Sequence, residues 1–207
     1  MMMGTLPKVW DACDKIRHAI VRGRFVPGQR LEPATLADEL TTSLTPIRNA
    51  LYRLSGERLV DAHSRDGFYV PLPTEAALRE LYDCMEERLL TCLARGALPG
   101  DRPYKRPTPH DGAAEATWLL FDTIALKTRV VETRYITQQA NDRLAPIRVA
   151  KRSLFPDAHA ELDELITAWE CADIARLARA LHAYHDRRLN RVPDIVALLN
   201  EARHAPH

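Results

Sequence analysis

The chain has 207 residues, enough for one large domain or two modest ones. Its net charge of +1 means that any attraction to nucleic acid depends on where the basic residues lie rather than on their sum. No stretch reaches the ~18 apolar residues of a membrane span, and the amino terminus lacks a secretory signal pattern. We therefore expect a soluble, cytoplasmic protein with no membrane partner. The four cysteines form no C-x-x-C pair and are expected to be buried thiols.

The first third of the chain predicts three helices. Residues 8 to 23 carry apolar positions at helical spacing, and the pattern stops at Gly23 and at Pro27-Gly28. Helical spacing returns at 33 to 40, breaks at 41 to 43 and resumes through residue 54. This pattern is typical of a helix, a short turn and a second helix.

The start of that second helix is well defined. Thr42 or Ser43 can cap it through a side-chain oxygen, and Pro46 fits its first turn. Its polar edge lies near the end that a recognition helix points into the major groove. The residues of this edge are Ser43, Thr45, Arg48, Asn49 and Tyr52. Residues 59 to 70 then predict a hairpin with its tip at 64 to 67. Residues 1 to 73 are therefore expected to form a winged helix-turn-helix with a small β-hairpin wing.

Residues 74 to 207 predict a second, all-α domain. A stiff Pro-Leu-Pro linker precedes it, and a proline-rich loop at 99 to 112 interrupts it. We expect an antiparallel helical bundle, and the protein as a whole to be mainly α. The expected helices cover 74–96, 113–126, 127–140, 142–154, 157–171, 173–191 and 193–203. The expected aromatic core residues are Trp118, Phe121, Tyr135, Trp169 and Tyr184.

The order PGQRLEPATLADEL, TTSLTPIRNALYRLSGERLV, DAHSRDGFYV resembles the DNA-binding domain of GntR-type transcriptional regulators, over roughly residues 8 to 73. Leu44 stands where that family usually has an arginine, and Asn49 where it has a glutamate. The missing arginine indicates an altered operator, because bidentate arginine to guanine is a main source of base discrimination. The resemblance implies a DNA-binding surface made of Arg30, Ser43, Thr45, Pro46, Arg48, Asn49, Tyr52, His63, Arg65 and Gly67.

The second domain is similar to the ligand-binding domain of the FadR-like subgroup, through Asn141-Asp142-Arg143-Leu144 and Ala172-Asp173. Many members hold a metal with an Asp-x-x-x-His pair and two later histidines, and small organic acids bind beside it. Here Thr128 and Glu132 take the places of that pair. The resemblance therefore implies a divalent metal, Zn, Ni, Fe or Mn, on Glu132, His159, His182 and His185. The alternative is that these histidines are solvated or hydrogen-bonded.

The subgroup also implies a small-molecule effector in the helical domain. A Y-x-x-R arginine is often present there, but here Tyr82 is followed by Met85. Arg88, one turn on, can replace that arginine or can pair with Glu87 instead. An apolar or uncharged effector therefore fits the sequence as well as a carboxylate does. Our candidate effector residues are Arg88, Trp118 and Tyr135.

Three functions remain open from the sequence. The first is a regulator that binds a pseudo-palindromic, double-stranded DNA operator as a homodimer and responds to an effector. The second is a DNA-binding protein whose helical domain only dimerises. The third is an enzyme using His182, Tyr184 and His185, but no nucleophile motif, phosphate loop or carboxylate pair supports it, so we expect no catalysis.

Overall fold

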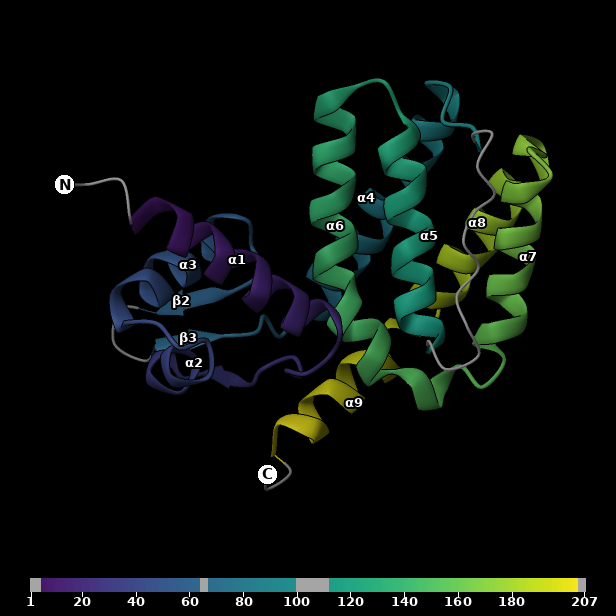
Figure 1. Ribbon diagram of the computed structural model, residues 1–207. Helices are drawn as coiled ribbons and strands as arrows, with labels where there is room; N and C mark the ends of the chain where they lie inside the picture. The colour runs from purple at the N-terminus through teal and green to yellow at the C-terminus, as the bar shows by residue number, and fades with distance from the viewer. Residues whose placement is uncertain (1–4, 64–66, 100–111, 205–207) are drawn as a thin grey trace.

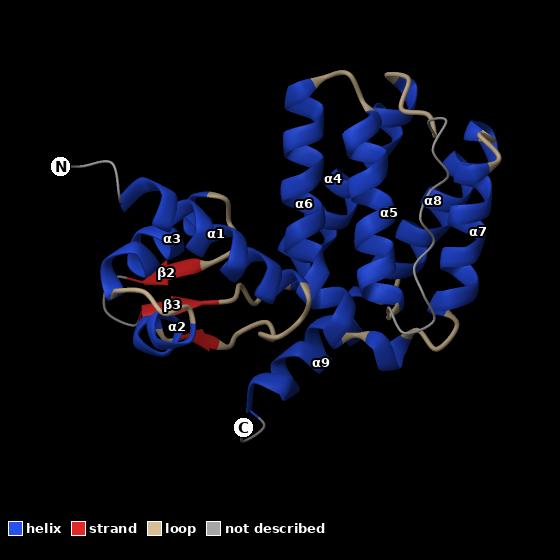
Figure 2. Ribbon diagram, in the orientation of Figure 1, coloured by secondary structure: helices blue, strands red, loops and turns tan. Residues whose placement is uncertain are grey.

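The computed structural model describes residues 5–63, 67–99 and 112–204. Figure 1 shows a small amino-terminal domain beside a larger helical domain, and Figure 2 shows that the strands lie in the small one. Each domain has its own hydrophobic core, one drawn from residues 12–70 and the other from residues 78–199. In the sequence, the Pro-Leu-Pro segment lies between the last residue of the first core and the first residue of the second.

The small domain is a winged helix-turn-helix, as expected. Its elements are α1 (Thr5–Val21), β1 (Arg30–Leu31), α2 (Pro33–Glu39), α3 (Leu44–Gly56), β2 (Asp61–His63) and β3 (Gly67–Tyr69). The three strands form an antiparallel sheet in the order β1-β3-β2. Apolar residues of α1, α2 and α3 pack behind the sheet because each helix keeps one apolar face.

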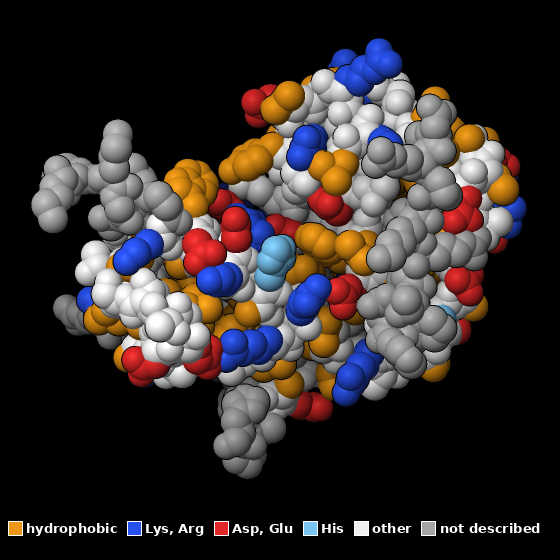
Figure 3. Space-filling view, viewed as in Figure 1, with side chains coloured by type: hydrophobic (Ala, Val, Ile, Leu, Met, Phe, Trp, Pro, Cys, Tyr) orange, Lys and Arg blue, Asp and Glu red, His pale blue; other side chains and the backbone are white. Residues whose placement is uncertain are grey.

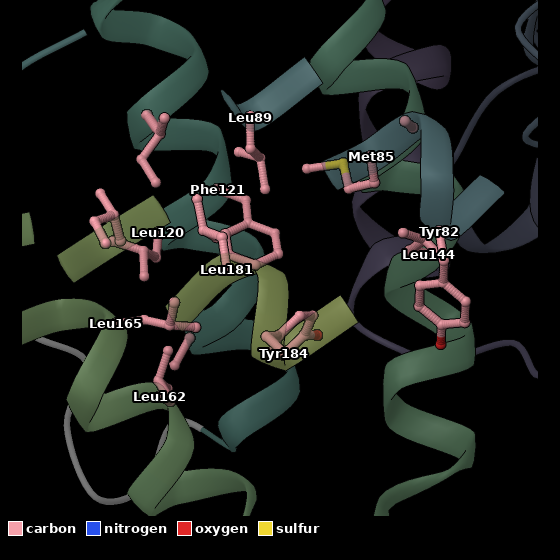
Figure 4. Close-up of a cluster of buried hydrophobic side chains, with 14 of the residues drawn as sticks. Tyr82, Met85, Leu89, Leu120, Phe121, Leu144, Leu162, Leu165, Leu181 and Tyr184 are labelled. Atoms are coloured by element: carbon pink, nitrogen blue, oxygen red, sulfur yellow. The ribbon is translucent and has the colours of Figure 1, made fainter. Parts of the chain in front are cut away.

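The second domain is an all-α bundle, which also confirms the expected fold class. Its elements are α4 (Glu75–Ala94), α5 (Ala113–Lys127), α6 (Val131–Ala150), the 3₁₀ turn η1 (Arg152–Leu154), α7 (Ala158–Glu170), α8 (Ile174–Leu189) and α9 (Val192–His204). Helix α4 contacts α5, α6, α8 and α9. Figure 4 shows side chains of α4, α5, α6, α7 and α8 meeting in the core, where the rings of Phe121 and Tyr184 lie 5.4 Å apart.

The expected break between helices near residue 141 is wrong, because α6 is continuous from Val131 to Ala150. Asn and Asp usually favour helix ends since their side chains compete for backbone groups. Here both side chains have partners on other helices: Asn141 Nδ2 donates to the Trp118 carbonyl at 2.9 Å, and Asp142 accepts from the Trp118 indole at 2.8 Å. Tertiary contacts thus keep two helix-breaking residues inside a helix.

The cysteines and the aromatic residues are only partly buried as expected. Cys13 and Cys92 are buried thiols, but Cys171, at the end of α7, is exposed. Phe121, Trp169 and Tyr184 are in the core, whereas Tyr135 is 52% exposed. In the part of the chain that the structure describes, no helix is long and apolar enough to cross a membrane.

Gly23 sits where the two domains meet. It lies two residues after the end of α1 with a φ of +72°, and a Cβ added to it would lie 2.6 Å from a methyl group of Val149 in α6. Helix α1 packs against both α3 and α6, so this contact joins the small domain to the bundle.

We predict that Gly23→Ala lowers the free energy of unfolding by at least about 1 kcal/mol, because alanine is strained at positive φ and its methyl group overlaps Val149. Urea denaturation measures the change. Gly56→Ala is the matched control, since an added Cβ there meets no atom within 4 Å and its stability should not fall. Equal stability of wild type and Gly23→Ala would contradict the close approach.

Candidate functional site

Helix α3 has one buried and one exposed face. Its buried residues are Pro46, Ile47, Ala50, Leu51 and Leu54, which belong to the helix face toward the small-domain core. The exposed edge carries Leu44, Thr45, Arg48, Asn49 and Tyr52. This edge offers a guanidinium, an amide and hydroxyl groups to an outside partner, which are the groups that read base edges in the major groove.

Ser43 occupies the N-cap position of α3, with extended backbone angles and an exposed side chain. Its side chain makes no capping hydrogen bond, so the expected capping role of the side chain is wrong. The hydroxyl group is therefore available to a partner. Pro46, which we expected in the DNA-binding surface, is buried. Its position in the first turn of α3 fits a role in starting the helix.

The wing stands beside α3. The ring of Tyr52 packs edge-on against Phe68 of β3, with centroids 5.0 Å apart. His63 is exposed and pairs with Gly67 across the hairpin. Arg30 is exposed next to the wing, since a Cβ added to Gly67 would lie 3.5 Å from its Nε. Tyr52 of α3 and Arg30 of β1 therefore both lie beside β3 of the wing. Arg65 lies outside the described residues.

One arginine connects α3 to the helical domain. Arg17, in α1, forms ion pairs with Glu57, the residue that caps the end of α3, and with Asp142 of α6 at 2.8 Å. Asp142 is buried, and burial raises its pKa although Arg17 and the Trp118 indole both stabilise the charged form. A cleft between the domains is lined by these groups and by Tyr135. Figure 3 shows charged and hydrophobic side chains along this boundary.

The predicted effector residues do not converge inside the bundle. Trp118 and Tyr135 line the interdomain cleft, and Trp118 donates to Asp142. Arg88 is half-buried elsewhere on α4 and pairs with Glu87 at 2.8 Å, which was the alternative to a ligand role.

The predicted metal ligands do not gather either. Glu132 and His159 are exposed, at the starts of α6 and α7. His182 pairs with Glu86 at 2.8 Å, which raises its pKa, and His185 is buried with Nδ1 2.7 Å from the Leu181 carbonyl. Among the described residues no three His, Cys, Asp or Glu side chains are close enough to hold a metal. The four residues come from three helices, α6, α7 and α8, and three of them are exposed while His185 is buried.

A different site lies in the helical domain: a cavity of about 440 Å³, within the usual size range of small-molecule pockets. It opens between α5, α6, η1, α7 and α8, and Arg22 of α1 reaches its rim. Three buried basic residues line it: Arg148 of α6, Lys151 just after α6, and Arg188 of α8. Tyr184, Phe155 and Val149 form part of its wall.

The basic side chains of the cavity have hydrogen-bond partners. Arg148 donates from Nη1 to the Asn141 side chain at 2.9 Å and from Nε to the Tyr184 hydroxyl at 3.3 Å. Lys151 Nζ donates to the Tyr82 hydroxyl at 2.7 Å, and burial lowers the pKa of Lys151 well below its ordinary value. Arg188 makes a two-armed ion pair with Glu161.

Sequence reasoning missed these three cations, although a signal was present. Arg148 lies four residues after Leu144, Lys151 four after Ile147 and Arg188 four after Tyr184, so each continues an apolar stripe of its helix. A charged residue on a buried stripe is uncommon because an unpaired buried charge is costly.

The burial of His185 generates a pH prediction. Burial lowers the pKa of His185 to about 3, whereas an ordinary histidine titrates near 6.5. Below pH 6.5 the His185 side chain therefore binds a proton in the unfolded chain, whereas in the native protein it binds one only near pH 3. The contribution of His185 to stability is therefore unchanged above pH 6.5 and becomes unfavourable as pH drops through this window, by up to about 1.4 kcal/mol per pH unit.

We predict that in the His185→Gln variant the free energy of unfolding falls less steeply as the pH is lowered. Urea unfolding of both proteins at intervals from pH 7 to pH 4.5 measures it, with the exposed His159→Gln variant as control, which should follow wild type. Parallel curves for wild type and His185→Gln would rule out this assignment.

The small domain is similar to known proteins. Residues 11–70 match the sequence model of the bacterial regulatory proteins of the gntR family. A stretch of 85 residues is 32% identical to the HTH-type transcriptional repressor GlaR of Escherichia coli strain K12. That stretch covers 39% of this chain and only 39% of the length of GlaR.

Two solved structures are similar over nearly the whole chain. E. coli McbR/YncC has a TM-score of 0.67 at 19% identity, covering 90% of this chain and 97% of that one. A putative transcriptional regulator GntR from Rhodococcus sp. RHA1 has a TM-score of 0.71 at 18% identity, covering 91% and 98%. At these identities the likeness establishes the fold. Residues 11–70 therefore form a winged helix-turn-helix that matches the gntR-family model, and the chain as a whole has the fold of these solved structures.

Proposed function

We propose that this protein is a cytoplasmic transcriptional regulator that binds a pseudo-palindromic DNA operator as a homodimer and responds to a small-molecule effector. The observation that carries this proposal is the exposed polar edge of α3, with Ser43, Thr45, Arg48 and Asn49 free of the small-domain core. The gntR-family match and the regulators among its relatives support it.

The operator should differ from that of relatives with an arginine at position 44. Leu44 is 40% exposed at the first turn of α3. An apolar side chain there can contact a thymine methyl group, whereas an arginine would pair with guanine. Arg48 is then the main cation of the reading edge.

The dimer follows from the small size of one reading helix, since two heads related by a two-fold axis supply the contacts that one lacks. A surface for it is supported by hydrophobic side chains at the turn between α5 and α6. These are Leu126, Val131, Tyr135 and Ile136, which are 43%, 75%, 52% and 41% exposed. Figure 3 shows hydrophobic side chains at this end of the bundle.

The effector response is supported by the cavity and by its connection to α3. Arg148 holds Asn141, whose neighbour Asp142 meets Arg17, and Arg17 meets Glu57 at the end of α3. A ligand that favours one arrangement of these contacts would bias the reading heads, with a coupling free energy of about 1–3 kcal/mol. A helical domain that only dimerises would need no such cavity.

We predict that Arg48→Ala weakens binding to an operator selected with the wild-type protein by about tenfold or more, with an unchanged fold. Fluorescence anisotropy at fixed salt measures the Kd, and circular dichroism checks the fold. Arg179→Ala, an exposed cation on α8, should bind like wild type. An operator affinity that survives the loss of Arg48 would refute its reading role.

A second prediction concerns assembly. Val131→Glu combined with Ile136→Glu should convert the dimer into a monomer, because two carboxylates per chain would face their copies across an apolar contact. Sedimentation velocity measures the mass. Ala160→Glu, at an exposed position on α7, should leave the dimer intact. A double variant that still sediments as a dimer would place the interface elsewhere.

A further inference from the structure

We propose that the interdomain cleft binds a small organic amine, with the ammonium group at the carboxylates of Asp14 and Asp122 and an aromatic body against the indole rings of the cleft. This inference goes beyond the proposed function, because the cleft shares no lining residue with the cavity of the helical domain. It adds a second small-molecule site, which selects a ligand of positive charge.

The cleft is large enough for such a ligand. Its volume is about 340 Å³, within the usual size range of small-molecule pockets. Residues of α1 and of the end of α3 line it from the small domain, and residues of α5 and α6 line it from the bundle. Figure 1 shows α1 beside α6. A molecule in the cleft would therefore contact both domains at once.

The charge of the cleft favours a cation. Among the described residues that line it, four are Asp or Glu and two are Arg, so the lining has two more carboxylates than guanidinium groups. Two of the carboxylates, those of Glu57 and Asp142, are paired with Arg17. The other two belong to Asp14 and Asp122, which leaves their negative charges for a ligand.

Asp14 and Asp122 come from opposite walls and have no basic partner in the part of the chain that the structure describes. Asp14, on α1, is exposed. Asp122, on α5, is half-buried and accepts a hydrogen bond from Gln138 Nε2 at 2.7 Å. Burial, together with the charge of Asp122 as a smaller cause, raises the pKa of the Asp142 carboxyl. An ammonium group beside Asp122 would offset this repulsion and supply charge-assisted hydrogen bonds.

The rings of the cleft favour an aromatic body on the amine. Trp10 and Trp118 both line it, and one of these rings already contacts a cation: the guanidinium carbon of Arg53 lies 3.6 Å from the ring centre of Trp10. Indole faces attract cations and also stack with flat rings. Tyr135 lines the cleft as well, but it belongs to the proposed dimer surface, so the test leaves it unchanged.

The polar groups suit an ammonium ion better than a metal ion. An ammonium group donates three hydrogen bonds, and carboxylate oxygens and the half-buried amide of Gln139 line the cleft as acceptors. Calcium or magnesium would need more oxygen ligands gathered around one point. Among the described residues no three His, Cys, Asp or Glu side chains meet in that way.

The cleft also adjoins the reading helix. Arg53 belongs to the last turn of α3, and Glu57 is the residue that caps its end. An amine held between Asp14 of α1 and Asp122 of α5 would fasten the small domain to the bundle beside this end of the helix. The site is therefore placed to fix the orientation of the reading domain.

The test uses the full chain without DNA, at neutral pH and constant ionic strength. The probes are phenethylamine, which has an ammonium group and a ring, butylamine, which lacks the ring, and phenethyl alcohol, which lacks the charge. Thermal unfolding and titration calorimetry measure binding, since a ligand of the native state raises the melting temperature. We expect saturable stabilisation by phenethylamine, weaker stabilisation by butylamine and none by phenethyl alcohol.

Three variants locate the site. Asp122→Asn should weaken phenethylamine binding about tenfold, because it removes a half-buried charged acceptor. Asp14→Asn should weaken it less, about threefold, because Asp14 is exposed to solvent. Asp163→Asn, at an exposed position on α7, is the matched control and should bind like wild type. All three are first shown to unfold cooperatively.

Three results would overturn the proposal. The first is that phenethylamine fails to stabilise the protein. The second is that butylamine or phenethyl alcohol stabilises it equally well, and the third is that Asp122→Asn and Asp14→Asn both retain wild-type affinity.

The outcome is separable from that of the proposed function, because no DNA is present. Arg48→Ala should bind phenethylamine like wild type, since Arg48 does not line the cleft. Amine binding by a protein that binds no operator would leave the cleft site standing and remove the regulator. Operator binding without amine binding would remove the cleft site and leave the regulator.

Discussion

The arrangement of this protein depends on one guanidinium group between two carboxylates. Arg17 of α1 meets Glu57 at the end of the reading helix and Asp142 inside the bundle. Asp142 is buried, so its charge is acceptable only because the arginine and an indole N–H face it. Packing of α1 against both α3 and α6 adds apolar contact to this polar joint, and Gly23 permits the close approach of the two domains.

Helix α6 contributes both to the contact with Arg17, through Asp142, and to the cavity wall, through Arg148. Asn141 and Asp142 are satisfied by Trp118, and one turn or more later Arg148 and Lys151 turn into the cavity. The basic groups are buried together, which is unusual unless a partner of opposite charge is at hand. A helix that bears both features can transmit a change in the cavity to the reading domain as a small shift of its own position.

Local sequence patterns predicted some features of the candidate sites and missed others. The reading edge of α3 was predictable because helical periodicity alone assigns Arg48 and Asn49 to the face opposite Ile47 and Ala50. The continuous α6 was not, because the partners of Asn141 lie on another helix. The cavity cations were missed for the same reason, although their place on apolar stripes was visible. Histidines that match by sequence spacing failed to gather, because spacing along the chain does not define distances between helices.

The sequence by itself determined the winged helix-turn-helix of the first domain and the helical nature of the second, because turns and apolar periods are properties of neighbouring residues. Only the tertiary structure decided which charged groups became buried together, and that Tyr135 faces outward while Arg148 and Arg188 face a shared cavity. Burial and electrostatic balance arise between segments far apart in the chain, so they exist only once the helices have packed.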